Sequence, residues 1–193
     1  MQTVITDLAR FMEFSEEEGE AFKKILRIKT LKKNDHILIE GDFCNYGIFI
    51  EKGCLRYYYM VEGVESTGNF FFENDWYADC ESFLYDKPSL QNIEALEDCV
   101  LYLAYKDDFD KLVSEYPVFN NFMRAMLERT IKGMTGKSMS MTLLSPEDRY
   151  LRFIKHCPRV VERVSLKYIA SYLGIKPESL SRIRTRLTLN SKS

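Results

Sequence analysis

Residues that hold metals and segments that span membranes are scarce in this sequence of 193 residues. It contains two histidines and five cysteines, and no two cysteines are spaced as a C-x-x-C pair. This scarcity argues against a disulfide framework, a zinc finger and a clustered iron–sulfur site, and a haem is not expected either. No apolar run approaches the ~20 residues of a membrane span, and the first residues lack the basic start and apolar core of a signal peptide. The sequence therefore predicts a cytoplasmic protein without a membrane partner.

Signatures of common enzymes are also missing. There is no G-x-S-x-G nucleophile motif, no glycine-rich phosphate loop and no zinc signature. A metal-dependent barrel enzyme of the cupin kind needs two or three histidines and a carboxylate around its metal. Only His36 falls within the part of the chain that we predict to be a β-barrel. We therefore expect no catalytic residues, no bound metal and no other cofactor.

The formal net charge of −2 conceals two regions of opposite sign. Residues 145–193 carry 11 basic and four acidic side chains, a net charge of +7, whereas the preceding 144 residues carry a net charge of −9. A compact basic segment on an acidic body suggests that one module faces a polyanion. Charge also fluctuates along any sequence, so the pattern within the basic segment decides the interpretation.

Residues 34–104 have the texture of antiparallel strands. Short runs rich in aromatic and β-branched residues alternate with turn formers such as Lys52-Gly53 and Glu62-Gly63. Turn signals at this frequency are typical of a β-sandwich or barrel. A capping box from Ser15 to Glu18 predicts a helix start before this region. A short helix over residues 107–116 is expected after it.

A longer helix is expected over roughly 118–140. Its apolar residues recur in steps of three and four, and such a stripe must pack either on its own domain or on the same helix of a second subunit. Gly133 and Gly136 each cost about 1 kcal/mol of helix propensity relative to Ala, so we expect the helix to fray or bend there and to form a hinge. The residues predicted for a dimer interface are Phe119, Phe122, Met123, Met126, Leu127, Ile131 and Met134.

The segment from Leu166 to Leu187 has the spacing of a helix-turn-helix. Small Ala170 is followed four residues later by Gly174, which tolerates the positive φ of a tight turn. A second helix begins at Pro177 and presents apolar residues on one face. In this motif the second helix enters the major groove of DNA.

The other face of the second helix is polar and basic. Arg182 could hold guanine and Glu178 could accept from cytosine, or the two side chains could merely form an i,i+4 ion pair on a solvated helix. The basic residues around them favour DNA binding. The residues predicted to contact DNA are Lys176, Glu178, Ser179, Ser181, Arg182, Arg184 and Arg186.

The run IASYLGIKPESLSRIR resembles the DNA-binding helix pair of Crp/Fnr-type bacterial transcription regulators. The runs SPEDRYLRFI, GDFCNYGIFIEKGCLRYYY and YKDDFDKLVSEYP resemble flanking pieces of that family in the expected order. The resemblance implies an α+β fold: a jelly-roll-like antiparallel β-roll of the cyclic-nucleotide-binding type with flanking helices over residues 1–115. It then implies a dimerisation helix and hinge over 116–144 and a helix-turn-helix domain over 145–193, with a wing that is reduced here.

The same resemblance implies a homodimer that binds double-stranded DNA, regulates transcription and has RNA polymerase as a further partner. It also places Glu178 and Arg182 at the family's base-reading positions. A small-molecule effector would bind within the β-roll and change the relative populations of two dimer geometries.

The effector region departs from the cyclic-AMP-binding members of the family. Where those members carry a Gly-Glu pair and, some ten residues on, Arg-Ser or Arg-Thr, this chain has Ala78-Asp79 and Ser89-Leu90. Without an arginine a buried phosphate has no bidentate partner, so we predict weak or absent cyclic AMP binding. The residues assigned to an effector pocket are Trp76, Asp79, Cys80, Ser89 and Gln91.

One alternative to a DNA-binding regulator remains open. The reduced wing and the acidic composition of the whole chain also fit a ligand-sensing or protein-interaction module that binds little or no DNA.

Overall fold

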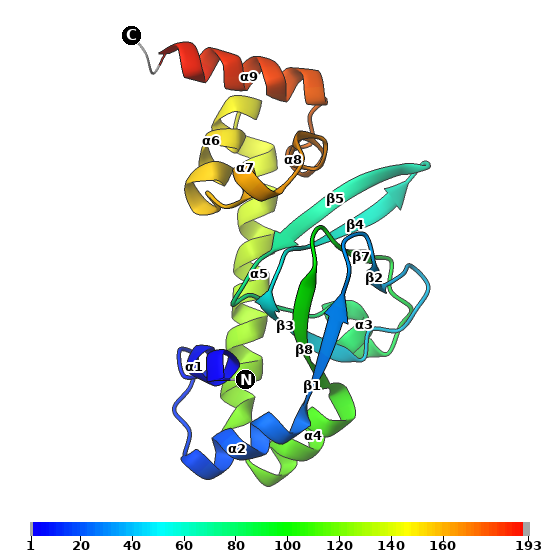
Figure 1. The fold of residues 1–193 in the computed structure, drawn as a ribbon, viewed down its shortest axis with the longest axis vertical. Helices are drawn as coiled ribbons and strands as arrows, with labels where there is room; N and C mark the ends of the chain where they lie inside the picture. Colours follow the sequence, from blue (N-terminus) through cyan, green and yellow to red (C-terminus); the bar gives the residue numbers. More distant parts are fainter. Residues whose placement is uncertain (1, 191–193) are drawn as a thin grey trace. The chain divides into compact units, whose positions relative to one another are not determined.

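The computed structural model describes residues 2–190, apart from the side chain of Asn190. Two four-stranded antiparallel sheets form a β-roll, with strand orders β1-β8-β3-β6 and β2-β7-β4-β5 (Figure 1). The strands are β1 (Leu26–Leu31), β2 (His36–Leu38), β3 (Tyr46–Lys52), β4 (Leu55–Val61), β5 (Val64–Phe71), β6 (Trp76–Tyr77), β7 (Asn92–Ala95) and β8 (Cys99–Tyr105). The predicted fold class, with its β-roll, long helix and C-terminal helices, is confirmed.

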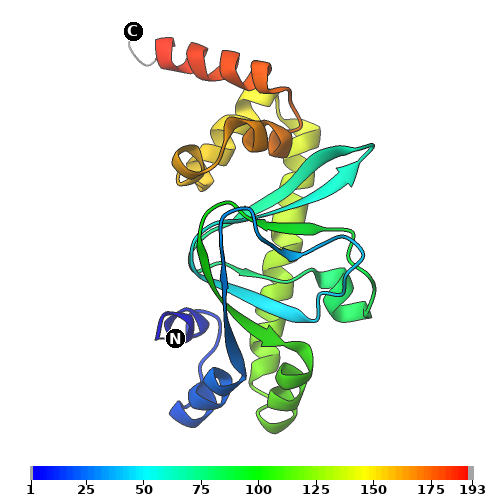
Figure 2. The ribbon, with the colours of Figure 1, turned by 45° about the vertical axis from the view of Figure 1, so that its right-hand side comes forward.

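Helices precede, interrupt and follow the roll (Figure 2). They are α1 (Gln2–Leu8), α2 (Glu16–Ile25), α3 (Cys80–Tyr85), α4 (Lys106–Glu115), α5 (Phe119–Leu143), α6 (Pro146–His156), α7 (Val160–Arg163), α8 (Leu166–Leu173) and α9 (Pro177–Asn190). The capping box predicted before α2 is present, since Ser15 and Glu18 each satisfy the other's backbone N–H.

The chain divides into two compact units. Residues 2–57 and 70–131 form the first, and residues 58–69 and 132–190 form the second. The helix α5 contributes to both units. It runs through Gly133 and Gly136 to Leu143, so the fraying expected at these glycines is not seen.

Alternation along β3 and β8 gives the first unit two apolar layers. Ile48, Ile50 and Leu101 point into the core between the sheets. Their neighbours Phe49 and Tyr102 point the other way, into a core made with α1, α2, α4 and the start of α5. Because both faces are buried, these strands read as nearly continuous apolar runs in the sequence.

Tight turns set the strand connections. Glu62 and Gly63 both have positive φ, at 52° and 78°, as a two-residue β4–β5 hairpin turn requires. At Gly53, with a φ of 108°, a Cβ would lie 2.5 Å from the Cys99 sulfur and 2.9 Å from its Cα, so only glycine fits. Both turns lie at the turn-forming pairs Lys52-Gly53 and Glu62-Gly63 that the sequence predicted.

Candidate nucleic-acid interface

The helix pair α8–α9 forms as predicted, and local capping explains its geometry. Ser165 caps α8 by accepting a hydrogen bond from the Tyr168 N–H. The helix ends at Gly174, whose φ of 66° lets the Ile175 N–H reach the Ala170 carbonyl. The two helices contact each other, and Ala170 of α8 and Leu180 of α9 are both fully buried. This packing fixes which face of α9 is left for solvent.

That solvent face carries most of the predicted DNA-contacting side chains. Lys176, Glu178, Ser181 and Arg182 are exposed, while Ser179 is half-buried. The Arg182 Nε donates to the Glu178 carbonyl at 3.4 Å, and no ion pair joins the two side chains among the described residues. The solvated ion pair that competed with DNA binding is therefore not formed here.

Two of the predicted residues have neighbours inside the second unit. Arg186 donates to the Glu147 carboxylate of α6, so its guanidinium is held toward the protein. Arg184, with Ser181 and Thr185, lines a shallow hollow of about 360 Å³ beside Leu166 of α8. These contacts make Arg184 and Arg186 weaker candidates for reading bases than Arg182.

The wing predicted to be reduced has no separate element in the described chain. Helix α9 continues to Asn190, and residues 191–193 lie outside the described part. Between α6 and α8 the chain forms only the short helix α7.

The first half of strand β5 forms hydrogen bonds with α8 and α5 within the second unit. The Ser171 hydroxyl accepts from the Thr67 N–H at 2.9 Å and donates to the Glu65 carbonyl at 3.1 Å. The Lys137 ammonium donates to the Gly68 carbonyl at 2.5 Å and to the Thr67 carbonyl at 3.4 Å. Sequence patterns did not indicate these contacts, because they join residues about 70 and 104 positions apart.

Burial of Lys137 makes the stability of the protein dependent on pH. Burial lowers the pKa of Lys137 from its ordinary 10.5 to about 8. Between these values the unfolded chain binds more protons than the folded one, so the free energy of unfolding rises with pH. We expect the melting temperature of the wild type, minus that of Lys137→Met, to increase from about pH 8 to about pH 10. Thermal unfolding followed by circular dichroism measures this difference.

The matched control for this titration is Lys155→Met, which removes an exposed lysine from α6. Its difference from the wild type should stay flat over the same pH range. An equally flat difference for Lys137→Met would contradict a lowered pKa.

The residues assigned to the effector pocket do not form one cluster. Trp76 is misassigned: its indole N–H donates to Asp7 at 2.8 Å and its ring packs on Phe49 and Phe122 in the helical core. An aromatic residue beside a strand end carries no sequence signal for which face it takes, so the sequence did not distinguish the two layers.

Hydrogen bonds join Asp79, Ser89 and Gln91 to one another, and Cys80 follows Asp79 as the first residue of α3. The Ser89 hydroxyl donates to the Asp79 carboxylate at 2.5 Å and accepts from the Gln91 N–H at 2.9 Å. Asp79 also caps α3 through the Glu81 N–H. The Cys80 thiol donates to the Ala78 carbonyl at 3.7 Å, and burial raises its pKa. Asp79 and Ser89 thus stabilise the start of α3 and the approach to β7.

Aromatic rings fill the neighbouring interior of the roll. Tyr77 stacks on Phe71 at 4.2 Å and on Tyr57 at 5.4 Å between ring centroids, and its hydroxyl donates to the Gln91 side chain. The three rings pack on the core between the sheets. This layer occupies space with apolar surface and offers no cation for a phosphate.

The β-roll contains a buried ion pair that the sequence did not predict. Arg56 of β4 is 0% exposed and donates to the Glu94 carboxylate of β7 at 2.5 Å. A charged residue within an alternating strand is normally read as facing solvent, so no sequence signal marked it.

The residues predicted for a dimer interface on α5 fall into two groups, one buried in the protein and one exposed. Phe119 and Phe122 are misassigned, because both side chains are buried in the core of the first unit. Met123 and Met126 pack against the same core. Ile131 is 63% exposed and Met134 is 68% exposed, so these two remain available to a second subunit.

Within residues 2–190, no helix is both long and apolar enough to cross a bilayer. The same residues contain no group of three or more histidine, cysteine, aspartate and glutamate side chains placed to hold a metal ion.

Comparisons with known proteins agree with the observed fold. Residues 28–116 match the cyclic nucleotide-binding domain family. FixK2 from Bradyrhizobium japonicum is 17% identical, with a TM-score of 0.77 over 86% of each chain. CLP from Xanthomonas campestris, described as a c-di-GMP-responsive global regulator, is 16% identical, with a TM-score of 0.73 over 92% of this chain and 93% of its own.

A transcriptional regulator described as Crp/Fnr family from Eubacterium rectale is 20% identical, with a TM-score of 0.67 over 92% of this chain and 85% of its own. No curated protein matches the sequence. Residues 28–116 are thus similar to cyclic nucleotide-binding domains, and the chain has the fold of Crp/Fnr-type regulators, as the resemblance in sequence implied.

Proposed function

We propose that this chain, a cyclic nucleotide-binding domain followed by a helix-turn-helix, is a homodimeric transcription regulator that binds specific sequences in double-stranded DNA. The observation that carries the proposal is the solvent face of α9, where Lys176, Glu178 and Arg182 lie exposed on a helix whose other face is buried. Two of the proteins that share this fold are described as regulators, which supports the same conclusion.

The mechanism follows from the geometry of duplex DNA. Two copies of α9, related by dimer symmetry, would enter major grooves one helical turn apart, about 34 Å. Arg182 can donate two parallel bonds to guanine, and Glu178 can accept from cytosine. Lys176, just before α9, would neutralise a phosphate.

An effector that changes this activity would act without the cyclic AMP chemistry of the family. Asp79 and Ser89 hydrogen-bond each other, aromatic rings fill the adjacent interior, and residues 89–90 supply no arginine. We therefore propose that the β-roll responds to a small molecule other than cyclic AMP, and that RNA polymerase is the downstream partner.

Base reading by Arg182 is testable by substitution. We expect Arg182→Ala to weaken binding to a selected palindromic site by ~10–100-fold, because one bidentate base contact contributes ~1–3 kcal/mol. On a duplex in which the contacted base pair is changed, Arg182→Ala and the wild type should bind with equal affinity. Fluorescence anisotropy with labelled duplexes measures both affinities, and added cyclic AMP should leave the curves unchanged.

Lys176→Ala is the matched control. It should weaken binding to all sequences alike and reduce the salt dependence, as loss of a phosphate contact does. If both variants bind the selected site as the wild type does, α9 does not read the bases. If the wild type binds no genomic fragment at low salt, the chain is a ligand-sensing or interaction module instead.

A further inference from the structure

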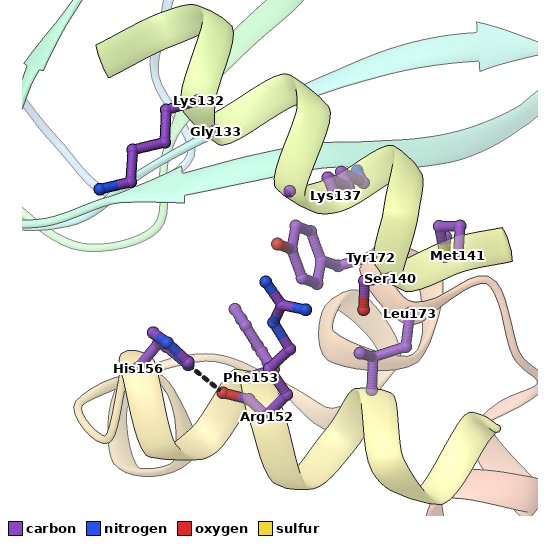
Figure 3. A pocket seen from close by; sticks show the side chains of 11 residues that line it. Lys132, Gly133, Lys137, Ser140, Met141, Arg152, Phe153, His156, Tyr172 and Leu173 are labelled. Atoms are coloured by element: carbon purple, nitrogen blue, oxygen red, sulfur yellow. Dashed lines mark hydrogen bonds between the residues drawn. The ribbon is translucent and has the colours of Figure 1, made fainter. Parts of the chain in front are cut away.

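The second unit contains a cavity that the proposed DNA-binding surface does not use. It has a volume of about 270 Å³ and lies among the C-terminal half of α5, α6 and α8 (Figure 3). Its size is near the lower end for small-molecule sites in proteins. The lining residues on which its chemistry depends are Lys132, Lys137, Arg152, Phe153, His156 and Tyr172.

The charge of the lining is of one sign. Lys132, Lys137 and Arg152 line the cavity, and no aspartate or glutamate does. None of these three side chains forms an ion pair with a carboxylate anywhere in residues 2–190. Their positive charge is thus left for solvent or for an anion, whereas Arg186 in the same unit is neutralised by Glu147.

The individual cations differ in what they can do. The Lys137 ammonium is turned to the Gly68 carbonyl and lies 4.4 Å from the centre of the Tyr172 ring, so it contributes charge rather than a free donor. The Arg152 guanidinium extends from α6 toward the Tyr172 ring (Figure 3). The His156 Nδ1 donates to the Arg152 carbonyl at 2.7 Å, which fixes the imidazole at the rim.

Glycine and aromatic residues shape the walls. At Gly136 a Cβ would lie 3.8 Å from the Arg152 Nη2, and at Gly133 nothing lies within 4 Å of that position. The missing side chains leave this flank of α5 open next to the guanidinium. On the opposite side, the Phe153 and Tyr172 rings lie 4.4 Å apart between centroids and provide an apolar floor.

We propose that this cavity is a binding site for a small phosphate-bearing anion, with Arg152 as its principal ligand and Lys132 and Lys137 as supporting charges. A guanidinium holds two phosphate oxygens in parallel, and the ammonium groups add charge without requiring a fixed geometry. The aromatic floor suits the carbon skeleton of a small phosphorylated molecule. Because Lys137 also donates to the Thr67 and Gly68 carbonyls of β5, an occupied cavity would act on the contact between β5 and α8.

Pyrophosphate serves as the probe in the test. Isothermal titration calorimetry of the full chain, without DNA and at constant ionic strength, should show saturable binding with one site per chain. Arg152→Gln should weaken this binding by about tenfold or more, since it removes a charge-assisted contact. Arg152 is exposed on α6, so the variant should fold, which circular dichroism checks.

Lys155→Gln is the matched control, because it removes one positive charge from the same helix outside the cavity. It should bind pyrophosphate as the wild type does. Equal weakening in both variants would show a general charge effect, and absence of binding to the wild type would show no site; either result overturns the proposal. Since no DNA is present, the outcome is independent of whether α9 reads bases.

Discussion

Replacing Glu94 by leucine is expected to lower the free energy of unfolding by about 3–5 kcal/mol, the range found when one partner of a buried ion pair is removed. Arg56 is 0% exposed and its guanidinium contacts the Glu94 carboxylate at 2.5 Å. The variant keeps the buried positive charge but removes this carboxylate, so an interaction that offsets the cost of desolvating the guanidinium is lost. Urea-induced unfolding followed by circular dichroism measures the change, provided that a single transition is seen.

The double variant Arg56→Met, Glu94→Leu separates charge from packing. It replaces both charged groups by apolar ones of similar volume, and such replacements are often neutral or stabilising. We expect it to recover most of the stability lost in Glu94→Leu. A double variant as unstable as the single one would mean that the lost stability came from altered packing and not from removing one charge of the pair.

The elements that local chemistry specifies were predictable from the sequence. The capping residues Ser15, Ser145 and Ser165 each begin a helix, and Gly174 ends α8 with positive φ, because these features depend only on neighbouring residues. The alternation of turn formers with aromatic runs predicted antiparallel strands in a sandwich or barrel for the same reason, whereas the β-roll itself came from the resemblance to a known family. The spacing of the apolar residues Leu180 and Ile183 predicted the buried face of α9, and therefore also its solvent face.

Features that depend on distant residues were not predictable. The burial of Arg56 depends on Glu94, which lies 38 positions away. The side of the sheet on which the Trp76 ring packs depends on its hydrogen bond to Asp7. The burial of Phe119 depends on Phe22 of α2, whose ring stacks on it with 5.5 Å between centroids. In each case the residue type fits either of two surroundings, so periodicity alone left the choice open.

The apolar residues of α5 show how an unpredicted contact affects the proposed dimer. In the sequence they form one continuous apolar face from Phe119 to Met134. The first two phenylalanines turn out to belong to the core, and the exposed part begins where the helix leaves it. A subunit interface must therefore use the later turns, with Ile131 and Met134 at its centre.

Introducing a charge there should have the largest effect on DNA binding. We expect Ile131→Glu to convert the dimer to a monomer, because two glutamates would face each other across an apolar contact. Affinity for a palindromic site should then fall by ~10²–10⁴-fold, the gain that linking two binding modules provides. Light scattering coupled to gel filtration measures the mass, and anisotropy measures the affinity.

The matched control for Ile131→Glu is Met139→Glu. Met139 is 52% exposed on the same helix, but it lies off the line that joins Leu127, Ile131 and Met134 at steps of four and three residues. This variant carries the same added charge and should stay dimeric with unchanged affinity. If both variants remain dimers, the subunits meet through another surface, and the spacing of the two α9 helices must be set there.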